Sequence, residues 1–284
     1  MLTPQIIDAA VAAALTEDAP WGDATSEAVI PADATATARL VARESGVLAG
    51  GAVFAAAMRL TDAAIETTVR QPDGAFFAAG SVLAQVSGPA RSVLTAERVA
   101  LNFIQRMSGI ATFTARYVVA VEGTGARIVD TRKTTPGLRA FERHAVVAGG
   151  GHNHRYSLSD AVLVKDNHLA VLTAGGLSVT QALREVRRRI GHTVHLEVEV
   201  DRIDQIEAVL AAGIDTIMLD NFSIDELREG VRVVHDRATI EASGGVNLDT
   251  VRAIAETGVD LISVGALTHS TRALDLGLDV VLAP

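Results

Sequence analysis

Basic side chains gather after two short β-branched runs in the second half of this 284-residue chain. The run ending at Val129 is followed by Asp130-Thr131-Arg132-Lys133-Thr134, and the run ending at Val164 by Lys165-Asp166-Asn167-His168. Between them, Gly149-Gly150-Gly151 leads into His152-Asn153-His154-Arg155. Residues 127–165 carry seven Lys or Arg and three acids, a net charge of +4 (7 − 3) inside a chain of net charge −9. This segment predicts a binding site for an anionic ligand.

Lysine usage points to the same segment. Of the 25 basic residues, 23 are Arg, and the two Lys are Lys133 and Lys165. A habit of composition that replaces surface Lys with Arg would explain the low number. A compact ammonium and a planar guanidinium are not equivalent at a tight site, however. We therefore expect both lysines to be functional.

Carboxylates follow the next two runs. Glu197 and Glu199 alternate within Val194–Val200 and so point to the same face of a strand, and Asp220-Asn221 follows the run after it. Two inward carboxylates are costly to bury unless cations or a metal compensate them. The pair Glu199 and Asp220 suits a Mg²⁺ ion that would hold a diphosphate and a sugar hydroxyl.

Glycine-rich turns follow the last two runs, as Ser243-Gly244-Gly245 and Val264-Gly265-Ala266. In barrels of parallel strands, such turns after late strands commonly bind phosphate, because exposed backbone N–H groups can approach its oxygens. These two turns therefore predict a phosphate site.

Each of these features alone has an ordinary explanation. A cation at a strand end can be a solvated rim charge, a single acid can cap the next helix, and a glycine pair is often a tight turn. Their shared position directly after strand-like runs favours a site. No pair of Ser and His stands out as nucleophile and base, so we expect catalysis by positioning and charge rather than through a covalent intermediate.

The elements that must position these residues are repeated βα units. The last strand-like runs start about 22 residues apart, which is close to one βα unit. Six or seven such units predict a parallel sheet that is a closed or nearly closed barrel. A doubly wound sheet is the alternative, although no GxGxxG turn follows the first run. The runs are Ala126–Val129, Ala161–Val164, Val194–Val200, Thr216–Leu219, Thr239–Ala242 and Leu261–Val264.

The first third of the chain predicts a mixed α+β layer instead of repeated units. Thr3-Pro4 is a good helix start, with a helix expected to about Leu15. Residues 92–122 predict one or two long helices with a break near Ser108-Gly109. Strands are expected at 36–43, 66–69 and 82–86, with an Ala-rich helix near 51–61.

Composition excludes several classes of function. The chain has no Cys, so disulfides, thiol nucleophiles and Cys-ligated metals are excluded. Its net charge of −9 argues against nucleic acid or an anionic membrane as a partner. The apolar stretch Ala9–Leu15 is too short to span a bilayer, and no basic segment precedes it, so we expect a cytoplasmic protein without a signal peptide.

At these residues the chain resembles the quinolinate phosphoribosyltransferases, also called nicotinate-nucleotide pyrophosphorylases (carboxylating). The matching stretches run in family order over nearly the whole chain and together are highly specific. They are Thr95–Phe103, Asp130–Thr134 with Pro136-Gly137, Gly149–Gly151 with Asn153–Arg155, Lys165–His168, Glu197–Val200, Met218–Phe222, Glu241–Val246 and Ser263–Thr268, and Glu17-Asp18 with Gly22-Asp23 also fits.

The resemblance implies an α/β fold with two domains. An N-terminal α/β sandwich domain would span residues 1–108 and be joined by the tail at 268–284. An incomplete, open-faced barrel of about seven strands would span 109–267. The resemblance also implies a homodimer in which Arg98 reaches into the partner subunit's site.

The implied reaction joins quinolinate to 5-phosphoribosyl-1-diphosphate and yields nicotinate mononucleotide, diphosphate and CO₂. Lys133 would face the diphosphate or the reacting carboxylate, and Glu199 and Asp220 would bind Mg²⁺ and the ribose hydroxyls. Lys133, Lys165, Glu199 and Asp220 are the residues expected to be catalytic. The quinolinate carboxylates and nearby phosphates would be held by Arg98, Thr131, Arg132, His154, Arg155 and Lys165, and the 5-phosphate by Ser243, Gly244, Gly245, Val264, Gly265 and Ala266.

Three alternatives stay open at this point. One is a related pyrophosphorylase of the same fold that acts on a different base. Another is a barrel aldolase or epimerase that uses Lys165 as a Schiff base. The third is a protein of this fold that binds anions without catalysis. The sequence assigns no role to His144, His152 or His269 and does not say which group assists decarboxylation.

Overall fold

The computed structural model describes residues 2–283, which form two compact units. The first unit contains residues 1–115, 134–150 and 268–284, and the second contains residues 116–133 and 151–267. The predicted boundary at 108/109 falls inside a continuous helix, and residues 134–150 group with the first unit, not with the barrel as expected. The grouping of residues into compact units thus differs from the expected limits, and the domain limits themselves remain a prediction.

The first unit is built on a four-stranded antiparallel sheet with the order β12-β1-β5-β3. Its strands are β1 (Thr35–Ala42), β3 (Glu66–Val69), β5 (Val82–Pro89) and β12 (Leu276–Ala283), and a separate pair joins β2 (Gly46–Val47) to β4 (Phe76–Phe77). Alternate residues of β1 are buried, as expected for a strand with one face on the core. The tail of the chain forms β12, which pairs with β1 along its length.

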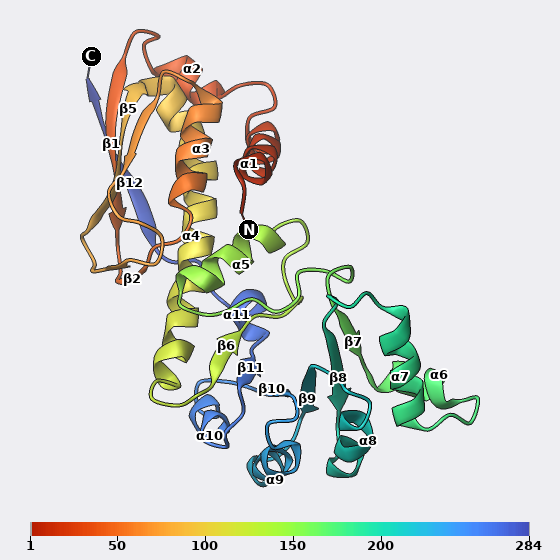
Figure 1. Ribbon diagram of the computed structural model, residues 1–284. Helices are drawn as coiled ribbons and strands as arrows, with labels where there is room; N and C mark the ends of the chain where they lie inside the picture. The colour runs from red at the N-terminus through yellow and green to blue at the C-terminus, as the bar shows by residue number, and fades with distance from the viewer. Residues whose placement is uncertain (1, 284) are drawn as a thin grey trace. The chain divides into compact units, whose positions relative to one another are not determined.

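Helices cover this sheet (Figure 1). They are α1 (Pro4–Asp18), α2 (Ala24–Val29), α3 (Gly51–Thr61), α4 (Ala90–Ala120), which continues into the second unit, and α5 (Arg139–Ala148). Thr3 caps α1 as predicted, with its side chain accepting the Ile6 N–H at 3.4 Å. The core of the unit is apolar and includes Leu40, Phe54, Met58 and Leu83, each fully buried.

The predicted break at Ser108-Gly109 is wrong, because α4 runs unbroken over 31 residues. Gly109 lies where another segment of the first unit crosses the helix closely. A Cβ at this position would lie 2.2 Å from the carbonyl oxygen of Arg272. Ser108 is fully buried and its hydroxyl bonds to the backbone N–H of Ala49 at 3.1 Å. Both residues are therefore small for close packing rather than for a turn.

The second unit holds a parallel sheet of six strands among the described residues, in the order β6-β11-β10-β9-β8-β7. They are β6 (Arg127–Val129), β7 (Val162–Val164), β8 (Leu196–Val200), β9 (Thr216–Asp220), β10 (Thr239–Ser243) and β11 (Leu261–Ser263). Each predicted run coincides with one strand to within two residues. The central strand β9 is buried on both faces and reads as a nearly continuous apolar run, whereas β8 alternates apolar residues with Glu197 and Glu199.

The strand order is that of a barrel left open between β6 and β7, the first two strands of the second unit. A doubly wound sheet would reverse direction in mid-sheet, and this order does not. On the free edge of β6, the segment before β7 adds a single parallel bridge, Val129 with His152, whose N–H donates to the Ile128 carbonyl at 2.8 Å. The open barrel is thus confirmed, with six strands and one isolated bridge instead of about seven strands.

Short helices connect the strands of the second unit on its outer side (Figure 1). Helices α7, α8, α9 and α10 contact one another in chain order. No helix in residues 2–283 combines the length and the apolar character needed to cross a membrane. The connecting helices are α6 (Asp166–Thr173), α7 (Val179–Arg189), η1 (Ile203–Gln205), α8 (Ile206–Leu210), α9 (Ile224–Val234), α10 (Val251–Ala255) and α11 (Ala266–His269).

Candidate active site

The register of the parallel strands brings the acidic residues to one face of the sheet. Glu199 on β8 pairs with Met218 on β9, and Met218 pairs in turn with Glu241 on β10. Asp220 lies two residues beyond Met218 and pairs with Ser243. Because side chains alternate along a strand and neighbouring strands are in register, Glu199, Asp220 and Glu241 share a face with Glu197.

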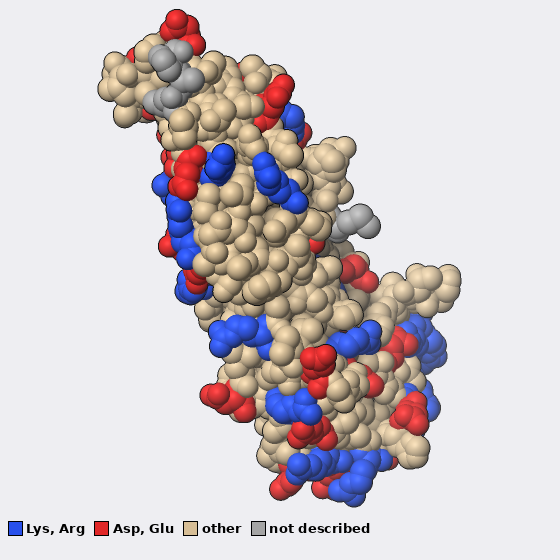
Figure 2. Space-filling model, turned by 90° about the vertical axis from the view of Figure 1, so that its left-hand side faces the viewer, with Lys and Arg blue, Asp and Glu red and all other residues tan. Residues whose placement is uncertain are grey.

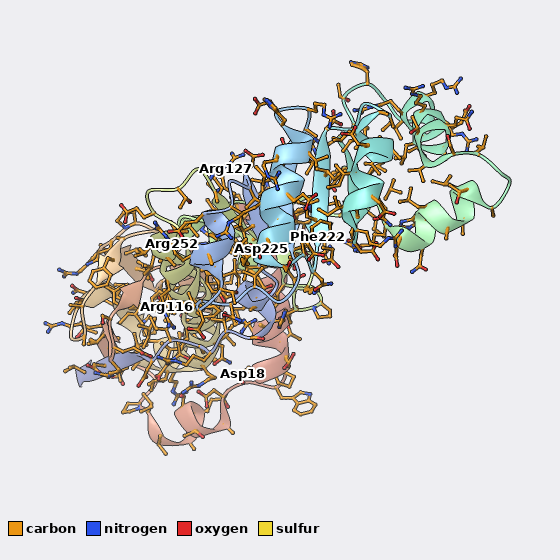
Figure 3. The ribbon with its side chains drawn as sticks, turned by 90° about the horizontal axis from the view of Figure 1, so that it is seen from below. Asp18, Arg116, Arg127, Phe222, Asp225 and Arg252 are labelled. Atoms are coloured by element: carbon orange, nitrogen blue, oxygen red, sulfur yellow. The ribbon has the colours of Figure 1, made fainter. Side chains whose placement is uncertain are left out.

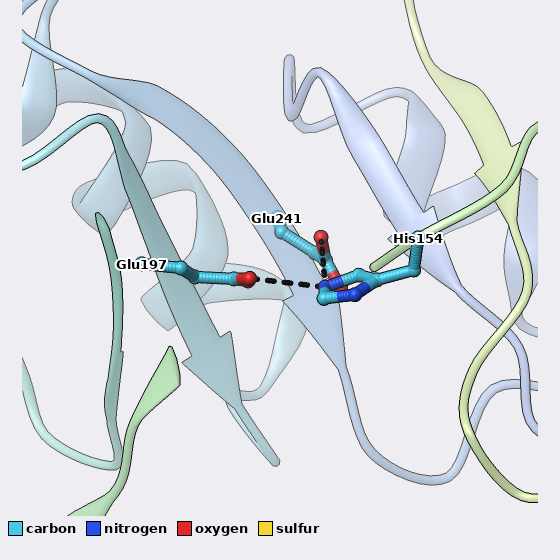
Figure 4. Close-up of side chains that lie close together, drawn as sticks. All are labelled: His154, Glu197 and Glu241. Atoms are coloured by element: carbon cyan, nitrogen blue, oxygen red, sulfur yellow. Dashed lines mark ion pairs between the residues drawn. The ribbon is translucent and has the colours of Figure 1, made fainter. Parts of the chain in front are cut away.

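A buried cluster of three ionisable side chains lies on this face (Figure 4). His154 Nε2 is 3.0 Å from Oε2 of Glu197 and 3.5 Å from Oε2 of Glu241. The side chain of Glu241 is 1% exposed and that of Glu197 is 5% exposed. The second oxygen of each carboxylate, Oε1, is buried without a hydrogen-bond partner among the described residues. Two carboxylates are therefore packed against one imidazole with too few donors for their oxygens.

The backbone fixes which ring nitrogen of His154 carries the proton. Nδ1 accepts the N–H of Arg155 at 2.7 Å, so the proton of the neutral ring lies on Nε2 and points at Glu197. A metal ion bound to Nε2 would need that nitrogen without its proton. The three side chains are close enough together to hold an ion, but the donor to Nδ1 makes a shared proton the better fit.

Burial and charge set the protonation of this cluster. Burial disfavours the imidazolium, but the hydrogen bond with Glu197 and the charges of Glu241, Glu197 and Asp130 outweigh it, so the pKa of His154 lies above its ordinary value. Burial, together with the charge of Glu197, raises the pKa of Glu241 to about 7. Glu241 is therefore about half protonated near pH 7 and holds its proton below that pH.

Asp130 connects this cluster to the end of β6. Its side chain is fully buried, and Oδ1 accepts the backbone N–H of His154 at 2.8 Å. Burial and the neighbouring guanidinium of Arg132 lower the pKa of Arg155. Two cations held close enough to repel one another are a receptor for an anion, because an anion between them relieves the repulsion.

The two lysines follow the two edge strands of the open barrel, β6 and β7. Lys165, just after β7, forms an ion pair with Glu199 on β8 and is 46% exposed. Lys133 follows β6 and is exposed, and its backbone N–H bonds to the Thr131 hydroxyl at 3.1 Å. The structure thus joins Lys165 to one of the predicted carboxylates.

Asp220 is held at the end of β9. Its Oδ2 accepts the side-chain N–H of Asn221 at 2.7 Å, and Asn221 has a left-handed backbone with φ of 59°. That carboxylate is partly exposed, and it lies diagonal to Glu199 on the neighbouring strand. Carboxylate oxygens so placed fit a hard divalent cation such as Mg²⁺.

The turn after β10 requires glycine at position 244. Its φ is +93°, and a Cβ there would lie 2.1 Å from the side-chain oxygen of Asn221. The next residue, Gly245, also has a positive φ, and a Cβ there would meet nothing within 4 Å. Exposed backbone therefore faces open space here, as a phosphate site requires. After β11, Val264, Gly265 and Ala266 form the matching turn into α11.

The remaining predicted or unassigned residues lie elsewhere. Arg98 belongs to α4 in the first unit. His144 is also there, with Nε2 2.7 Å from Oδ2 of Asp73, whose carboxylate caps α3 through the N–H groups of Gly50 and Gly51. His152 contributes its backbone to the bridge with β6, and His269 is exposed beside the Ser270 hydroxyl at 2.7 Å.

Sequence reasoning missed Glu241 as a site residue. The residue lies inside a run that reads as a core strand, and an isolated acid there gives no signal of its partners. The available signal was its position within β10, in register with the strands that carry Glu197 and Glu199. That register becomes visible only when all the strands are aligned.

Charge on the outer surface is mixed. On the face shown in Figure 2, basic and acidic side chains alternate without an extended area of one sign. A nucleic-acid-binding face would carry a continuous basic area. The face in Figure 2 shows no such area.

Comparisons with known proteins give one consistent result. The family model described as "Quinolinate phosphoribosyl transferase, N-terminal domain" matches residues 23–108, and the model for its C-terminal domain matches residues 110–279. A "Nicotinate-nucleotide pyrophosphorylase (carboxylating)" from Mycobacterium leprae is 45% identical over 275 residues, covering 94% of each chain. A probable enzyme of the same name from Bacillus subtilis is 41% identical over 267 residues, 94% of this chain and 91% of that one.

Solved structures agree with these matches. The crystal structure of NadC from Streptococcus pyogenes superimposes with a TM-score of 0.95 at 40% identity, covering 100% of this chain and 99% of that one. The nicotinate-nucleotide pyrophosphorylase of Francisella tularensis gives a TM-score of 0.92 at 35% identity, with 99% and 98% covered.

Proposed function

This chain belongs to the quinolinate phosphoribosyltransferase family, and from that premise we propose how its site carries out the family's reaction. The enzyme is a decarboxylating pentosyltransferase of NAD biosynthesis. Its substrates are quinolinate and 5-phosphoribosyl-1-diphosphate, and its products are nicotinate mononucleotide, diphosphate and CO₂. The observation that supports placing the reaction at this site is the guanidinium of Arg155, which lies close enough to Arg132 and to Glu197 of the buried acid cluster for both charges to shift its pKa.

Quinolinate is a dianion, and the cations of the second unit suit its two carboxylates. Arg132 and Arg155 would each offer a planar fork of N–H donors, and Lys165 a compact third charge. The Thr131 hydroxyl accepts the backbone N–H of Lys133 and so helps to hold the loop that carries Lys133. His154 belongs to the same set through Arg155, whose backbone N–H donates to its Nδ1 at 2.7 Å.

The phosphoribosyl group would lie along the carboxyl ends of β8 to β11. Glu199 and Asp220 would hold Mg²⁺ and the ribose hydroxyls, because both offer carboxylate oxygens on one face of neighbouring strands. When bound, the ion neutralises charge on the diphosphate as it departs. The 5-phosphate would be held by backbone N–H groups at Ser243, Gly244, Gly245, Val264, Gly265 and Ala266.

The chemistry then needs orientation and charge more than a nucleophile from the protein. The arginines hold the ring so that its nitrogen faces the anomeric carbon. The nitrogen attacks as the carbon–oxygen bond to diphosphate breaks, with Lys133 facing the departing charge and the carboxylates beside the developing positive charge. The resulting pyridinium accepts the electron pair as the adjacent carboxylate leaves as CO₂, and the ring carbon then takes a proton.

One assay tests the proposed function. Purified protein with 5-phosphoribosyl-1-diphosphate and Mg²⁺ is offered quinolinate or nicotinate, and the release of diphosphate and CO₂ is followed. We expect equal amounts of both products with quinolinate and neither with nicotinate. Turnover of nicotinate alone would assign the protein to a related pyrophosphorylase. Binding of the phosphoribosyl donor without release of diphosphate would leave it a non-catalytic protein.

A further inference from the structure

The cluster of His154, Glu197 and Glu241 contains more acceptors than donors. The imidazole supplies one N–H, from Nε2, and the nearby Ser263 hydroxyl donates to the backbone carbonyl of Ala242 at 3.4 Å. Against that N–H stand four carboxylate oxygens, two of them buried without a partner among the described residues. With both carboxylates ionised, two negative charges would share a site almost closed to water, which is costly.

We propose that Glu241 is a positioning residue that keeps a proton inside this cluster and so limits the negative charge that an anionic substrate meets beside Arg155. This inference rests on the proposed function, because it concerns the affinity of the same site for quinolinate. Glu241 would act on the substrate site indirectly. It contacts His154, and His154 in turn accepts the backbone N–H of Arg155.

The surroundings of Glu241 explain why it, among the acids present, holds the proton. It lies on β10 in the middle of the sheet, and its side chain is 1% exposed. The titratable groups that face it are His154 from the loop before β7, Glu197 from β8 and Asp130 from the end of β6. Its partner on β9, Met218, and Leu261 on β11 carry no charge. Burial and acid neighbours thus favour its neutral form.

The charge of an ionised Glu241 would affect the substrate site through two contacts. Glu241 contacts His154, and His154 accepts the backbone N–H of Arg155. The charge of Glu197 acts on the Arg155 guanidinium directly. A second full negative charge in the cluster would offset the attraction of Arg132 and Arg155 for a dianion. Loss of the Glu241 proton above about pH 7 should therefore weaken quinolinate binding without altering the reacting groups.

The test compares KM for quinolinate and kcat across about pH 6.5 to about pH 8.5, with the other substrate saturating. For the unaltered enzyme we expect KM to rise by about tenfold over this range while kcat changes by less than about twofold. In Glu241→Gln the cluster cannot gain that charge, so KM should stay nearly constant. A matched control is Glu207→Gln on α8, an exposed acid paired with Arg237, which should follow the unaltered enzyme. A KM for Glu241→Gln that rises in parallel with the control would overturn the proposal.

A second measurement needs no variant and no turnover. Calorimetric titration of quinolinate into the unaltered protein near pH 7.5, in two buffers of different ionisation enthalpy, counts protons taken up on binding. We expect a net uptake approaching one proton, because the bound dianion favours the protonated cluster. Binding with no proton uptake would refute the role of Glu241. Absence of nicotinate mononucleotide in the assay above would instead count against the proposed function and leave the proton count informative.

Discussion

At the scale of single residues, the proposed site separates cations that would face the substrate from buried groups that hold neighbouring residues in place. Arg132 and Lys133 follow β6 and Lys165 follows β7, while Arg155 lies in the loop before β7. Asp130 and Glu197 are buried and act on the backbone or ring of His154. Residue type alone predicted the first group, because charge after a strand is visible in the sequence. The second group depends on contacts between distant segments and was visible only in part.

Lys133→Met should remove one cation from the region of the departing diphosphate. We expect the fold to be kept, since Lys133 is exposed, and transition-state stabilisation to fall by about 2–4 kcal/mol. The measurement is kcat/KM for 5-phosphoribosyl-1-diphosphate, with the circular dichroism spectrum as a check on folding.

A matched control lies on the same strand. Arg127, labelled in Figure 3, is exposed at the amino end of β6, the end opposite to Lys133. Arg127→Met should leave kcat/KM unchanged, because active sites of this type lie at the carboxyl ends of the strands. Near-normal turnover by Lys133→Met would remove Lys133 from the mechanism.

At the scale of elements, helix α5 is fixed by one buried acid. Glu142 is 1% exposed and pairs with Arg106 of α4 at 2.8 Å, while its other oxygen accepts the backbone N–H of Thr135 at 3.1 Å. Arg106 in turn donates to the carbonyls of Thr268 and Thr271. Three segments distant in sequence therefore meet at one ion pair within the first unit. One of them begins directly after Lys133, and another begins at Thr268, within α11.

Glu142→Ala should destabilise the protein strongly, because it leaves Arg106 partly buried without its carboxylate. The expected loss is about 3–5 kcal/mol in the free energy of unfolding. Asp8→Ala, which breaks the exposed pair of Asp8 with Arg59 in the same unit, should cost less than about 1 kcal/mol. Urea denaturation followed by circular dichroism compares the two. Equal midpoints would show that the Glu142 pair contributes no more than a surface pair.

Prediction of the elements from sequence succeeded where local pattern dominates. The parallel strands were found because runs such as Thr216–Asp220 are buried on both faces. It failed at Gly109, where a glycine that commonly ends a helix instead allows the chain at Arg272 to cross closely. It also missed Glu241, whose partners come from other strands. In each failure the deciding contact is long-range, so no local pattern records it.

At the scale of the whole molecule, one predicted residue of the site does not belong to the second unit. Arg98 lies on α4 in the first unit, and its proposed place is the partner subunit's active site. The family resemblance suggested a homodimer in which each site is completed across the interface. A symmetric dimer would complete both of its sites in this way.

Mixing two inactive variants tests this arrangement. Arg98→Ala and Lys165→Ala, refolded together in equal amounts, should recover about one quarter of the unaltered activity, since half the dimers are mixed and each has one intact site. Lys133→Ala mixed with Lys165→Ala is the control and should recover nothing, because each subunit's own site then lacks one of its two lysines and no site of a mixed dimer is intact. Recovery no better than this control would mean that Arg98 acts within its own chain or not at all.

The placement of the two lysines has a practical consequence for handling this protein. Its two ε-amino groups, of Lys133 and Lys165, are both exposed and both follow edge strands of the open barrel. In most proteins, acylating dyes and amine-directed immobilisation react with many surface lysines far from the active site. In this chain the lysine side chains that they can modify are Lys133 and Lys165. Such reagents should inactivate the enzyme at low stoichiometry. A bound ligand that slows the labelling of the two amines would show that the site is occupied.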